Sequence, residues 1–522
     1  MKEPQKSFSS SSTPVVFVLV FVCFILGSGV VSILGSSWFT NISYAPLSWS
    51  TKSTPSSTTA ATVAIIGSDV HANLADILHK GEVFSGFNAT FNLSSQPPPH
   101  VTEAISIPKN RDKIKLEEQR ISSEYVHIRR RVNNRFTKLN KLESGLARAR
   151  AAIREATQNE NQTKDDYYIP QGPIYANAYA FQRSYLEMEK QFKVFIYEEG
   201  EPPLFHNGPC KSLYSMEGNF IHELEIHPRF RTRDPDKAHV FFLPFSVTMM
   251  VKFIYESGSH NTDPMRATVT DYVNIISTKY PYWNRSLGAD HFMLSCHDWG
   301  PLVSTYVPLL YSNSIRVLCN ANTSEGFNPV KDASFPEINL QTGKTKGWIG
   351  GPSPSHRPIL GFFAGGLHGP VRPILFDHWK NVDEDMQIHQ SLPKGMVYQD
   401  MMKKSRYCFC PSGYEVASPR IVEAIYTGCI PVLISDHYIP PFSDVLKWKS
   451  FAVVVSPKDI PNLKRILNGI SQRQYIRMQR RGVQVRRHFE VNKPSRRYDV
   501  FHMILHSIWL RRLNVRVVDH FD

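Results

Sequence analysis

The chain has 522 residues, 42% of them hydrophobic and 12% aromatic, a length and composition that suit a globular enzyme of two or three domains. Its formal net charge of +14 is uneven, because residues 111–155 hold 13 Lys or Arg against 6 Asp or Glu, half of the excess. This concentration argues against a surface built throughout to bind polyanions such as nucleic acids.

A long uncharged segment lies near the N-terminus. Pro14–Leu34 is a run of 21 residues without a charge, which at about 1.5 Å each match a bilayer core of about 30 Å. Lys2 and Lys6 precede it and predict that the tail at 1–13 stays in the cytosol. A cleaved signal peptide is the alternative, but the apolar run is longer than a usual signal core. We therefore expect a transmembrane signal-anchor of type II, with the rest of the chain in the lumen of the secretory pathway, where nucleic acid is not a partner.

Sequons and cysteines fit a lumenal chain. Six Asn-x-Ser/Thr sequons follow the anchor, at Asn41, Asn88, Asn92, Asn161, Asn284 and Asn322. Six of the seven cysteines also follow it, so disulfides can form, but 15 pairings remain open. Cys408 and Cys410 lie two residues apart on one face of a predicted strand, and neither belongs to a zinc motif. We interpret these two cysteines as packing residues.

Residues 35–174 are predicted to form a lumenal stem. Its first part is rich in Ser, Thr, Ala and Pro and holds no helical or strand period, as a flexible linker does. A basic helix is predicted over 111–156, where apolar residues recur at heptad spacing, at Leu139, Leu142, Leu146, Ala149 and Ile153. This short seam predicts either a coiled-coil homodimer or a basic helix that lies on its own catalytic domain, and the pattern does not choose between them.

Strands alternate with helices on both sides of a Gly-rich link that ends near residue 357. In a first domain, at 175–355, we expect strands at 192–197, 238–244, 291–295 and 316–318 and helices at 217–226 and 262–278. In a second, at 356–490, we expect strands at 359–364, 406–410, 430–434 and 451–455 and helices at 398–404, 419–427, 460–467 and 472–489. A C-terminal helix and tail follow at 491–522. The alternation predicts an α/β fold of two Rossmann-like parallel-sheet domains that face a cleft, with ligands beyond the carboxyl ends of the strands.

The stretch Arg406–Ser435 predicts a strand, a polar turn, a helix and a second strand. Ser418 suits the N-cap of that helix, and Arg420 and Glu423 then lie on one of its faces. The helix N-terminus and Arg420 suit a diphosphate, whereas Glu423 suits ribose hydroxyls. The alternative is a surface Arg–Glu pair on an ordinary helix, and local geometry does not choose between the two.

Candidate acid–base residues lie at strand ends and turns of the first domain: Asp290, His291, His297, Asp298, His206 and Glu325. A transfer to a hydroxyl group needs a general base, which a carboxylate or an imidazole can supply. We place Asp298 and His291 first, although Asp298 could cap a turn and His291 could be a satisfied core histidine. The Asp-x-Asp patterns at 234–236 and 383–385 are interpreted as solvated turns rather than metal ligands.

Five segments carry a family resemblance: FKVFIYEEGEPPLFHNGPC, DKAHVFFLPFSV, DHFMLSCHDWGP, GPSPSHRPILGFFAGG and CPSGYEVASPRIVEAIYTGCIPVLISD. Over about 175–512 the chain resembles the plant branch of the exostosin family, which are Golgi type II glycosyltransferases of cell-wall synthesis. The resemblance implies a GT-B fold, inversion at the anomeric carbon and a nucleotide-sugar donor used without metal. It also implies that the turn at Ser418 and Arg420 holds the diphosphate, that Glu423 holds the ribose, and that Gly413 and Tyr414 line the same pocket.

The expected function is thus an inverting glycosyltransferase that moves a sugar from a UDP-sugar to a plant cell-wall polysaccharide. The motif wording is similar to a pectin xylosyltransferase branch, so pectin is the expected acceptor and the Golgi membrane the expected location, with no cofactor and no metal. The stem helix could join two copies or a complex. The alternative is a non-catalytic Golgi scaffold or assembly partner that keeps the fold, and a retaining transferase is a third possibility.

Overall fold

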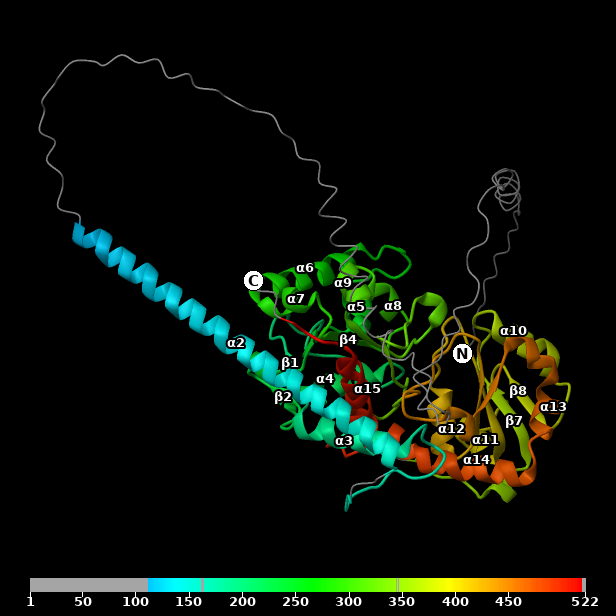
Figure 1. Cartoon of the computed structure of the whole chain (residues 1–522). Helices are drawn as coiled ribbons and strands as arrows, with labels where there is room; N and C mark the ends of the chain where they lie inside the picture. The colour runs from blue at the N-terminus through cyan, green and yellow to red at the C-terminus, as the bar shows by residue number, and fades with distance from the viewer. Residues whose placement is uncertain (1–110, 161–163, 344, 346, 519–522) are drawn as a thin grey trace, which may run out of the picture. The chain divides into compact units, whose positions relative to one another are not determined.

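The computed structural model describes residues 111–160, 164–343, 345 and 347–518, whose course is shown in Figure 1. The predicted cytosolic tail, the anchor at Pro14–Leu34 and the first part of the stem lie outside the described residues, and so do the sequons at Asn41, Asn88, Asn92 and Asn161. Within the described ranges, no helix is both long and apolar enough to cross a membrane.

The first half of the described chain is built on a six-stranded sheet with strand order β2-β1-β3-β4-β5-β6. All of its strand pairs are parallel. The strands are β1 (Val194–Ile196), β2 (Arg231–Thr232), β3 (Val240–Phe242), β4 (His291–Ser295), β5 (Ile315–Leu318) and β6 (Ala333–Ser334). Every residue of β1, β3, β4 and β5 is buried, as expected when helices cover both faces of a parallel sheet.

The helices of this half are α4 (Ser215–Ile226), α5 (Val247–Phe253), α6 (Asp263–Lys279), α7 (Pro281–Ser286), α8 (Gly300–Ser304) and α9 (Pro308–Ser312). Successive strand residues serve opposite faces. Phe242 and Phe292 belong to one apolar cluster, whereas Phe241 and Met293 belong to another. The sheet therefore stands between two cores.

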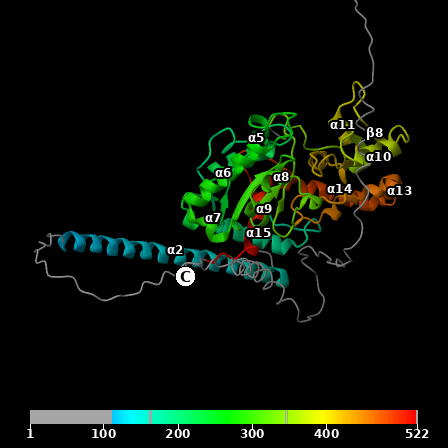
Figure 2. The same ribbon diagram turned by 90° about the horizontal axis from the view of Figure 1, so that it is seen from above.

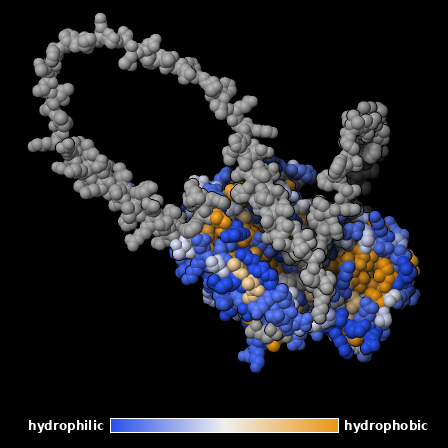
Figure 3. All heavy atoms as spheres, in the orientation of Figure 1, coloured by the Kyte–Doolittle hydropathy of each residue, from blue (hydrophilic) through white to orange (hydrophobic). Residues whose placement is uncertain are grey.

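The second half repeats the plan with a five-stranded sheet of order β11-β10-β9-β7-β8, again with every pair parallel. Its strands are β7 (Ile359–Ala364), β8 (Met386–His389), β9 (Ser405–Pro411), β10 (Ile430–Ile434) and β11 (Val453–Val455). Its helices are α10 (Val371–Trp379), α11 (Tyr398–Lys404), α12 (Arg420–Thr427), α13 (Leu463–Asn468) and α14 (Gln472–Val485). Figure 3 shows a mostly hydrophilic face, with apolar residues at the surface over the second sheet. Two Rossmann-like parallel-sheet domains in one chain are the predicted GT-B fold.

The basic helix predicted in the stem is α2 (Arg111–Asn159), and its last part packs on α3 (Ala178–Gln191) of the first half. Figures 1 and 2 show α2 running beside that half. Leu146, Ala149 and Ile153, three residues of the heptad seam, are buried in the first apolar cluster. The structure thus favours the second interpretation of the seam, in which the helix lies on its own domain.

The last helix, α15 (Val500–Asn514), returns from the second half to the first sheet and contacts β5, β6, α2 and α3. Backbone bonds join the halves as well. Ile439 donates to the carbonyl of Ala321 at 3.0 Å, and Phe442 donates to that of Ser334 at 3.2 Å. The two sheets are therefore tied together on the side where their strands end.

Candidate active site

A cavity of about 600 Å³ lies where the carboxyl ends of both sheets meet, a size that suits a small-molecule ligand. From the first half, Asp298 after β4 and Glu337 after β6 line it. From the second half, the turn between β9 and α12 lines it, together with residues that follow β7. Loops at the carboxyl ends of parallel strands are the usual place for ligands in α/β proteins.

All five predicted donor-site residues line this cavity: Gly413, Tyr414, Ser418, Arg420 and Glu423. The Arg420 guanidinium donates twice to the Ala364 carbonyl at the end of β7, at 3.1 and 3.3 Å, and lies over the Phe363 ring at 5.2 Å. Ile421, Val422 and Ile425 turn the other way and are buried in the first apolar cluster. The predicted faces of α12 are confirmed, because its polar face borders the cavity.

The start of α12 differs from the prediction. Ser418 makes no side-chain cap, and its hydroxyl instead accepts a bond from Arg420 Nη1 at 3.4 Å. The N–H groups of Ile421 and Val422 donate to the carbonyls of Ser418 and Pro419 at 3.3 and 3.0 Å. Because these carbonyls already occupy the first-turn donors, anion binding at this turn depends on side-chain cations more than on the helix N-terminus.

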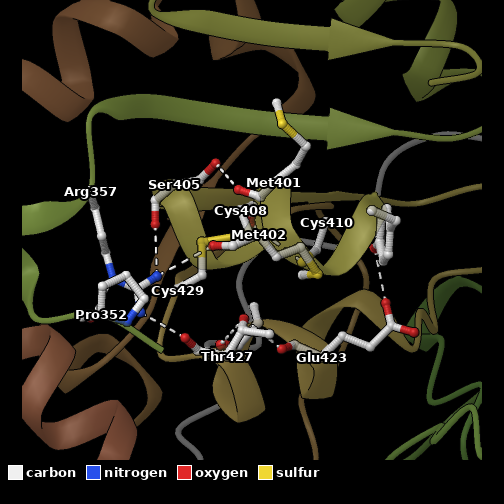
Figure 4. The surroundings of a disulfide bond; sticks show 12 residues. Pro352, Arg357, Met401, Met402, Ser405, Cys408, Cys410, Glu423, Thr427 and Cys429 are labelled. Atoms are coloured by element: carbon white, nitrogen blue, oxygen red, sulfur yellow. Dashed lines mark hydrogen bonds between the residues drawn. A yellow bond between two sulfur atoms is a disulfide. The ribbon is translucent and has the colours of Figure 1, made fainter. Parts of the chain in front are cut away.

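Glu423 is 6% exposed and accepts a hydrogen bond from the Tyr398 hydroxyl at 2.9 Å. Burial raises the pKa of this carboxyl, against the bond from Tyr398 and the charge of Arg420, which lower it. Figure 4 shows the carboxyl at the end of its side chain, away from the helix. Its other oxygen remains available to a ligand hydroxyl.

Several lining residues were missed from the sequence: Glu337, His368, Arg372, Tyr398 and Glu415. Arg372 lies in the first turn of α10, after β7, just as Arg420 begins α12 after β9. That repeated pattern of a strand, a glycine turn and a helix with an early Arg was a usable signal. Glu337 had none, because it follows the two-residue strand β6.

Glu337 is 5% exposed and forms no hydrogen bond through its side chain with another described residue. Burial raises the pKa of this carboxyl well above its usual value, and the charge of Asp298 adds to the rise. The neutral acid is therefore favoured, and a neutral carboxyl can donate a hydrogen bond to a ligand.

Asp298 also lines the cavity, as predicted for a base candidate. Burial raises the pKa of its carboxyl, whereas a hydrogen bond from Tyr214 and the charge of His297 lower it. A partly buried carboxyl with a raised pKa suits a general base.

The loop that carries Asp298 is held by a buried carboxylate. Glu217 of α4 is fully buried, and its Oε1 accepts from the Cys296 and His297 N–H groups at 2.9 and 3.0 Å and from Ser295 Oγ at 3.1 Å. Its Oε2 accepts from Ser246 Oγ at 2.5 Å and from the Thr248 N–H group at 3.1 Å. Because it accepts five hydrogen bonds, Glu217 holds the end of β4 and the loop that follows it in place.

Acidic residues also meet across the cavity mouth. Asn320, after β5, donates to Glu325 Oε2 at 3.2 Å and to Glu415 of the second half. Burial and the neighbouring charge of Glu325 raise the pKa of Glu415 to about 7.

The prediction that His291 is a base is wrong. The side chain is fully buried in β4 and does not line the cavity. Its Nδ1 bonds to Asp290 Oδ1 and its Nε2 to the Tyr197 hydroxyl, both at 2.8 Å. It is the satisfied core histidine of the alternative. His206 is engaged in the same way, by Glu225 at 2.7 Å and by the Glu199 carbonyl at 3.2 Å.

Residues 188–470, more than half of the chain, match the Exostosin GT47 domain. The chain belongs to this family. It is 64% identical over 382 residues to Probable glycosyltransferase At5g03795 of Arabidopsis thaliana, covering 73% of this chain and 74% of that protein. It is 28% identical over 347 residues to Probable glucuronoxylan glucuronosyltransferase IRX7 of the same plant, covering 60% and 76%. The fold is also similar to the crystal structure of Anabaena Alr3699/HepE in complex with UDP, with a TM-score of 0.32, 9% identity and coverage of 60% of this chain and 97% of that one. The protein is a glycosyltransferase.

Two disulfides stabilise this glycosyltransferase. Cys296 directly follows β4 and Cys319 directly follows β5, and a disulfide joins them beside the cavity. Cys408 of β9 is joined to Cys429, as Figure 4 shows, so its interpretation as a packing residue was wrong. Cys410 is buried and free, as a packing residue would be.

The Asp-x-Asp patterns engage lysines. Asp236 accepts from Lys138 at 3.1 Å, and Lys464 pairs with both Asp383 and Asp385. Among the described residues, no group of three or more His, Cys, Asp or Glu is arranged to hold a metal ion.

Two predicted glycosylation sites lie in the described part of the chain. Asn284 is exposed. Asn322 is 7% exposed, and its amide nitrogen donates to Glu325 Oε1 at 3.0 Å. The Asn284 amide nitrogen also donates, to the Ser277 carbonyl at 2.8 Å, so exposure separates the two sites. Because a glycan needs an exposed asparagine, we expect Asn284 rather than Asn322 to carry one.

Proposed function

We propose that the protein is an inverting, metal-independent glycosyltransferase that moves a sugar from a UDP-sugar to an acidic polysaccharide of the plant cell wall, pectin. The proposal includes the predicted type II topology in the Golgi membrane. One observation carries it. A single cavity holds an arginine with no ion-pair partner among the described residues, Arg420, and a half-buried carboxyl with a raised pKa, Asp298.

The donor side is the edge of the second sheet. Arg420 stabilises the negative charge that develops on the departing diphosphate, a task that a metal ion performs in other enzymes. Glu423, held by Tyr398, accepts from the ribose hydroxyls. The same cavity is also lined by Gly413, Tyr414 and Ser418.

The acceptor side is the edge of the first sheet. Asp298 takes the proton from the acceptor hydroxyl, whose oxygen attacks the anomeric carbon. The bond from that carbon to the diphosphate oxygen breaks, and the nucleoside diphosphate leaves with the electron pair. One displacement of this kind inverts the anomeric configuration. Glu337, favoured as the neutral acid, is a poor proton acceptor and suits a hydrogen bond to a sugar oxygen.

The acceptor and location rest on other observations. The relative IRX7 carries a polysaccharide, glucuronoxylan, in its name, which supports a polysaccharide acceptor. The uncharged run at Pro14–Leu34 supports a membrane anchor.

A donor and acceptor screen of the full chain tests the proposal. UDP- and GDP-sugars are offered with homogalacturonan and xylan oligosaccharides, with and without EDTA, and the anomeric configuration of the product is read by NMR. We expect inverted product from a UDP-sugar on homogalacturonan at a rate that EDTA leaves unchanged. A retained configuration, or loss of activity in EDTA, would contradict the mechanism.

The rival function, a non-catalytic scaffold, is separated by a simpler measurement. A scaffold is expected to show no thermal stabilisation by UDP or GDP, whereas ligand present at 100 times its dissociation constant stabilises a folded protein by about 2.7 kcal/mol.

A further inference from the structure

Two arginines that line the cavity approach one aromatic ring, that of the buried Phe363. The guanidinium of Arg420 lies 5.2 Å from the centre of the Phe363 ring, and that of Arg372 lies 5.8 Å from it. Arg420 begins α12 after β9, and Arg372 lies in the first turn of α10 after β7, the neighbouring strand. Both line the cavity.

Neither charge is neutralised by a carboxylate of the described residues within ion-pair distance. Arg372 is 7% exposed, donates from Nη1 to the Gly366 carbonyl at 3.1 Å, and keeps a buried Nε without a partner. Burial, and then the charge of Arg420, lower the pKa of Arg372 to about 10. Arg372 is buried and Arg420 is half-buried. The Glu337 carboxyl acts on both charges from beyond ion-pair distance, but its burial favours the neutral acid. Two like charges beside one ring are unfavourable, and a bound anion removes that penalty.

Arg357 shows what a structural buried arginine looks like in the same domain. It is 3% exposed, and all three of its nitrogens donate, to the carbonyls of Pro352, Met402, Ser405 and Thr427 at 2.7–3.3 Å. Figure 4 shows this fan of bonds around its guanidinium. Arg372, by contrast, keeps N–H groups that donate to no other described residue.

Glycines keep both guanidiniums uncovered. A Cβ at Gly365 would lie 2.4 Å from Arg420 Nη2, and a Cβ at Gly413 would lie 2.9 Å from Arg372 Nη2. Neither glycine has a positive φ, so space rather than backbone conformation requires the missing side chain. Any larger residue would push its guanidinium out of place.

An anion that binds both guanidiniums needs several negative charges on oxygens, placed so that each guanidinium can make two hydrogen bonds. A diphosphate meets this requirement, because each guanidinium can bind a different phosphate bidentately. A uronate carboxylate of the acceptor carries one charge and suits one fork. The first N–H groups of α12 already donate to backbone carbonyls, so side chains are the main donors left for a diphosphate.

We infer that Arg372 and Arg420 act as a guanidinium pair that grips the diphosphate of the donor between them, with Arg372 as a second direct ligand. The inference rests on the proposed function and deepens it. Arg372 binds the diphosphate in the ground state and holds its charge as the sugar–oxygen bond breaks.

Isothermal titration of the full chain with inorganic pyrophosphate, UDP, UMP and galacturonate tests the pair. We compare the wild type with Arg372→Gln, Arg420→Gln and Arg372→Lys. The control is Arg406→Gln, because Arg406 also stacks on a ring, that of Tyr475 at 4.3 Å, and also has a buried Nε without a partner, but lies outside the cavity.

Each Gln variant should weaken pyrophosphate and UDP binding about 10- to 100-fold and UMP binding much less, because a charge-assisted hydrogen bond is lost. Arg372→Lys should restore part of the loss, and Arg406→Gln should bind as the wild type does. Thermal unfolding of each variant identifies any that fails to fold, and Arg372→Lys then carries the test.

Two results would overturn the inference while leaving the proposed function intact. One is UDP affinity unchanged in Arg372→Gln. The other is a selective loss of galacturonate binding in that variant, which would assign Arg372 to the acceptor. Failure of the wild type to bind UDP, GDP or pyrophosphate would overturn the proposed function, and the inference with it.

Discussion

The carboxyl edges of the two sheets differ in charge although they share one plan. The edge of the second sheet presents two cations, Arg372 and Arg420, that have no ion-pair partner among the described residues, together with the carboxyls Glu415 and Glu423. The edge of the first presents carboxyls, Asp298 and Glu337. In the proposed reaction, the cations of the second edge face the diphosphate, which gains charge, and Asp298 of the first edge faces the acceptor hydroxyl, which loses a proton. Two sheets of the same architecture can thus supply side chains of opposite charge to one reaction.

The edges also differ in how they are held. The second edge depends on short strand–turn–helix units, each continuous in sequence. The first depends on distant partners. Glu217, about 80 residues before Asp298 in the chain, fixes the loop after β4, and the Cys296–Cys319 disulfide joins that loop to the end of β5. Variants at the two edges can test this difference in how the side chains are supported.

The largest effect is expected at the proposed base. Asp298→Asn keeps the shape but cannot accept the proton, so kcat should fall about 10²- to 10⁴-fold with UDP affinity unchanged. The control is Asp385→Asn, an exposed carboxylate paired with Lys464. A kcat within threefold of wild type in Asp298→Asn would remove this residue from the mechanism.

The pH profile sharpens that test. Because burial raises the pKa of Asp298, kcat should decline, as pH falls, at a higher pH than an ordinary Asp would give. Protonation removes the base, so this acid limb should vanish from the residual activity of Asp298→Asn. A limb that persists in the variant points to another carboxyl, such as Glu415.

The two disulfides separate stability from activity. They close loops of similar length, with separations of 23 and 21 residues, so removing either should cost about 3 kcal/mol of unfolding free energy. Only the Cys296→Ser, Cys319→Ser pair should also lower kcat in the remaining folded protein, because that bridge adjoins Asp298. Urea unfolding and kcat, measured on both double variants, check this, and equal kcat values would contradict the division.

A smaller effect is expected from Glu217→Gln. The amide nitrogen cannot accept hydrogen bonds, so the bonds at one oxygen are lost and the variant should lose about 1–3 kcal/mol of stability. Because the loop carries Asp298, kcat should fall while UDP affinity stays constant. Glu256→Gln, a change in an exposed loop, is the control. A fall in UDP affinity would show that Glu217 also supports the second edge.

The smallest effect is expected from Gly413→Ala, which places a methyl group 2.9 Å from Arg372 Nη2. The guanidinium must shift, so UDP affinity should fall by up to about tenfold, with little change in stability. Gly482→Ala is the control, because a Cβ there meets nothing within 4 Å. Unchanged UDP affinity would argue that Arg372 is free to move.

The difference between the edges also explains what could be predicted. The five predicted donor-site residues line one cavity, and they could be grouped from the sequence because Arg406–Ser435 carries its own strand, turn and helix signals. The strand at 291–295 and the helix at 398–404 were likewise predicted with the observed bounds, since their apolar runs are sharply delimited.

The failures concern tertiary partners. The choice of His291 failed because its burial depends on Tyr197, almost 100 residues away, which no local pattern reveals. Arg372 was missed although the pattern around Arg420 repeats there; its contact with the Phe363 ring, which Arg420 shares, is visible only in the structure. The pairing of Cys408 with Cys429 depends on β9 lying beside β10, so strand order had to be known first.

The return of α15 to the first sheet has a consequence for biosynthesis. Phe501, Ile508 and Trp509 belong to the same buried cluster as Val240 and Phe292, which the ribosome makes more than 200 residues earlier. The core of the first half is therefore incomplete until α15 has been synthesised. The two halves must mature together, and a nascent chain stalled before α15 would expose an unfinished core to chaperones.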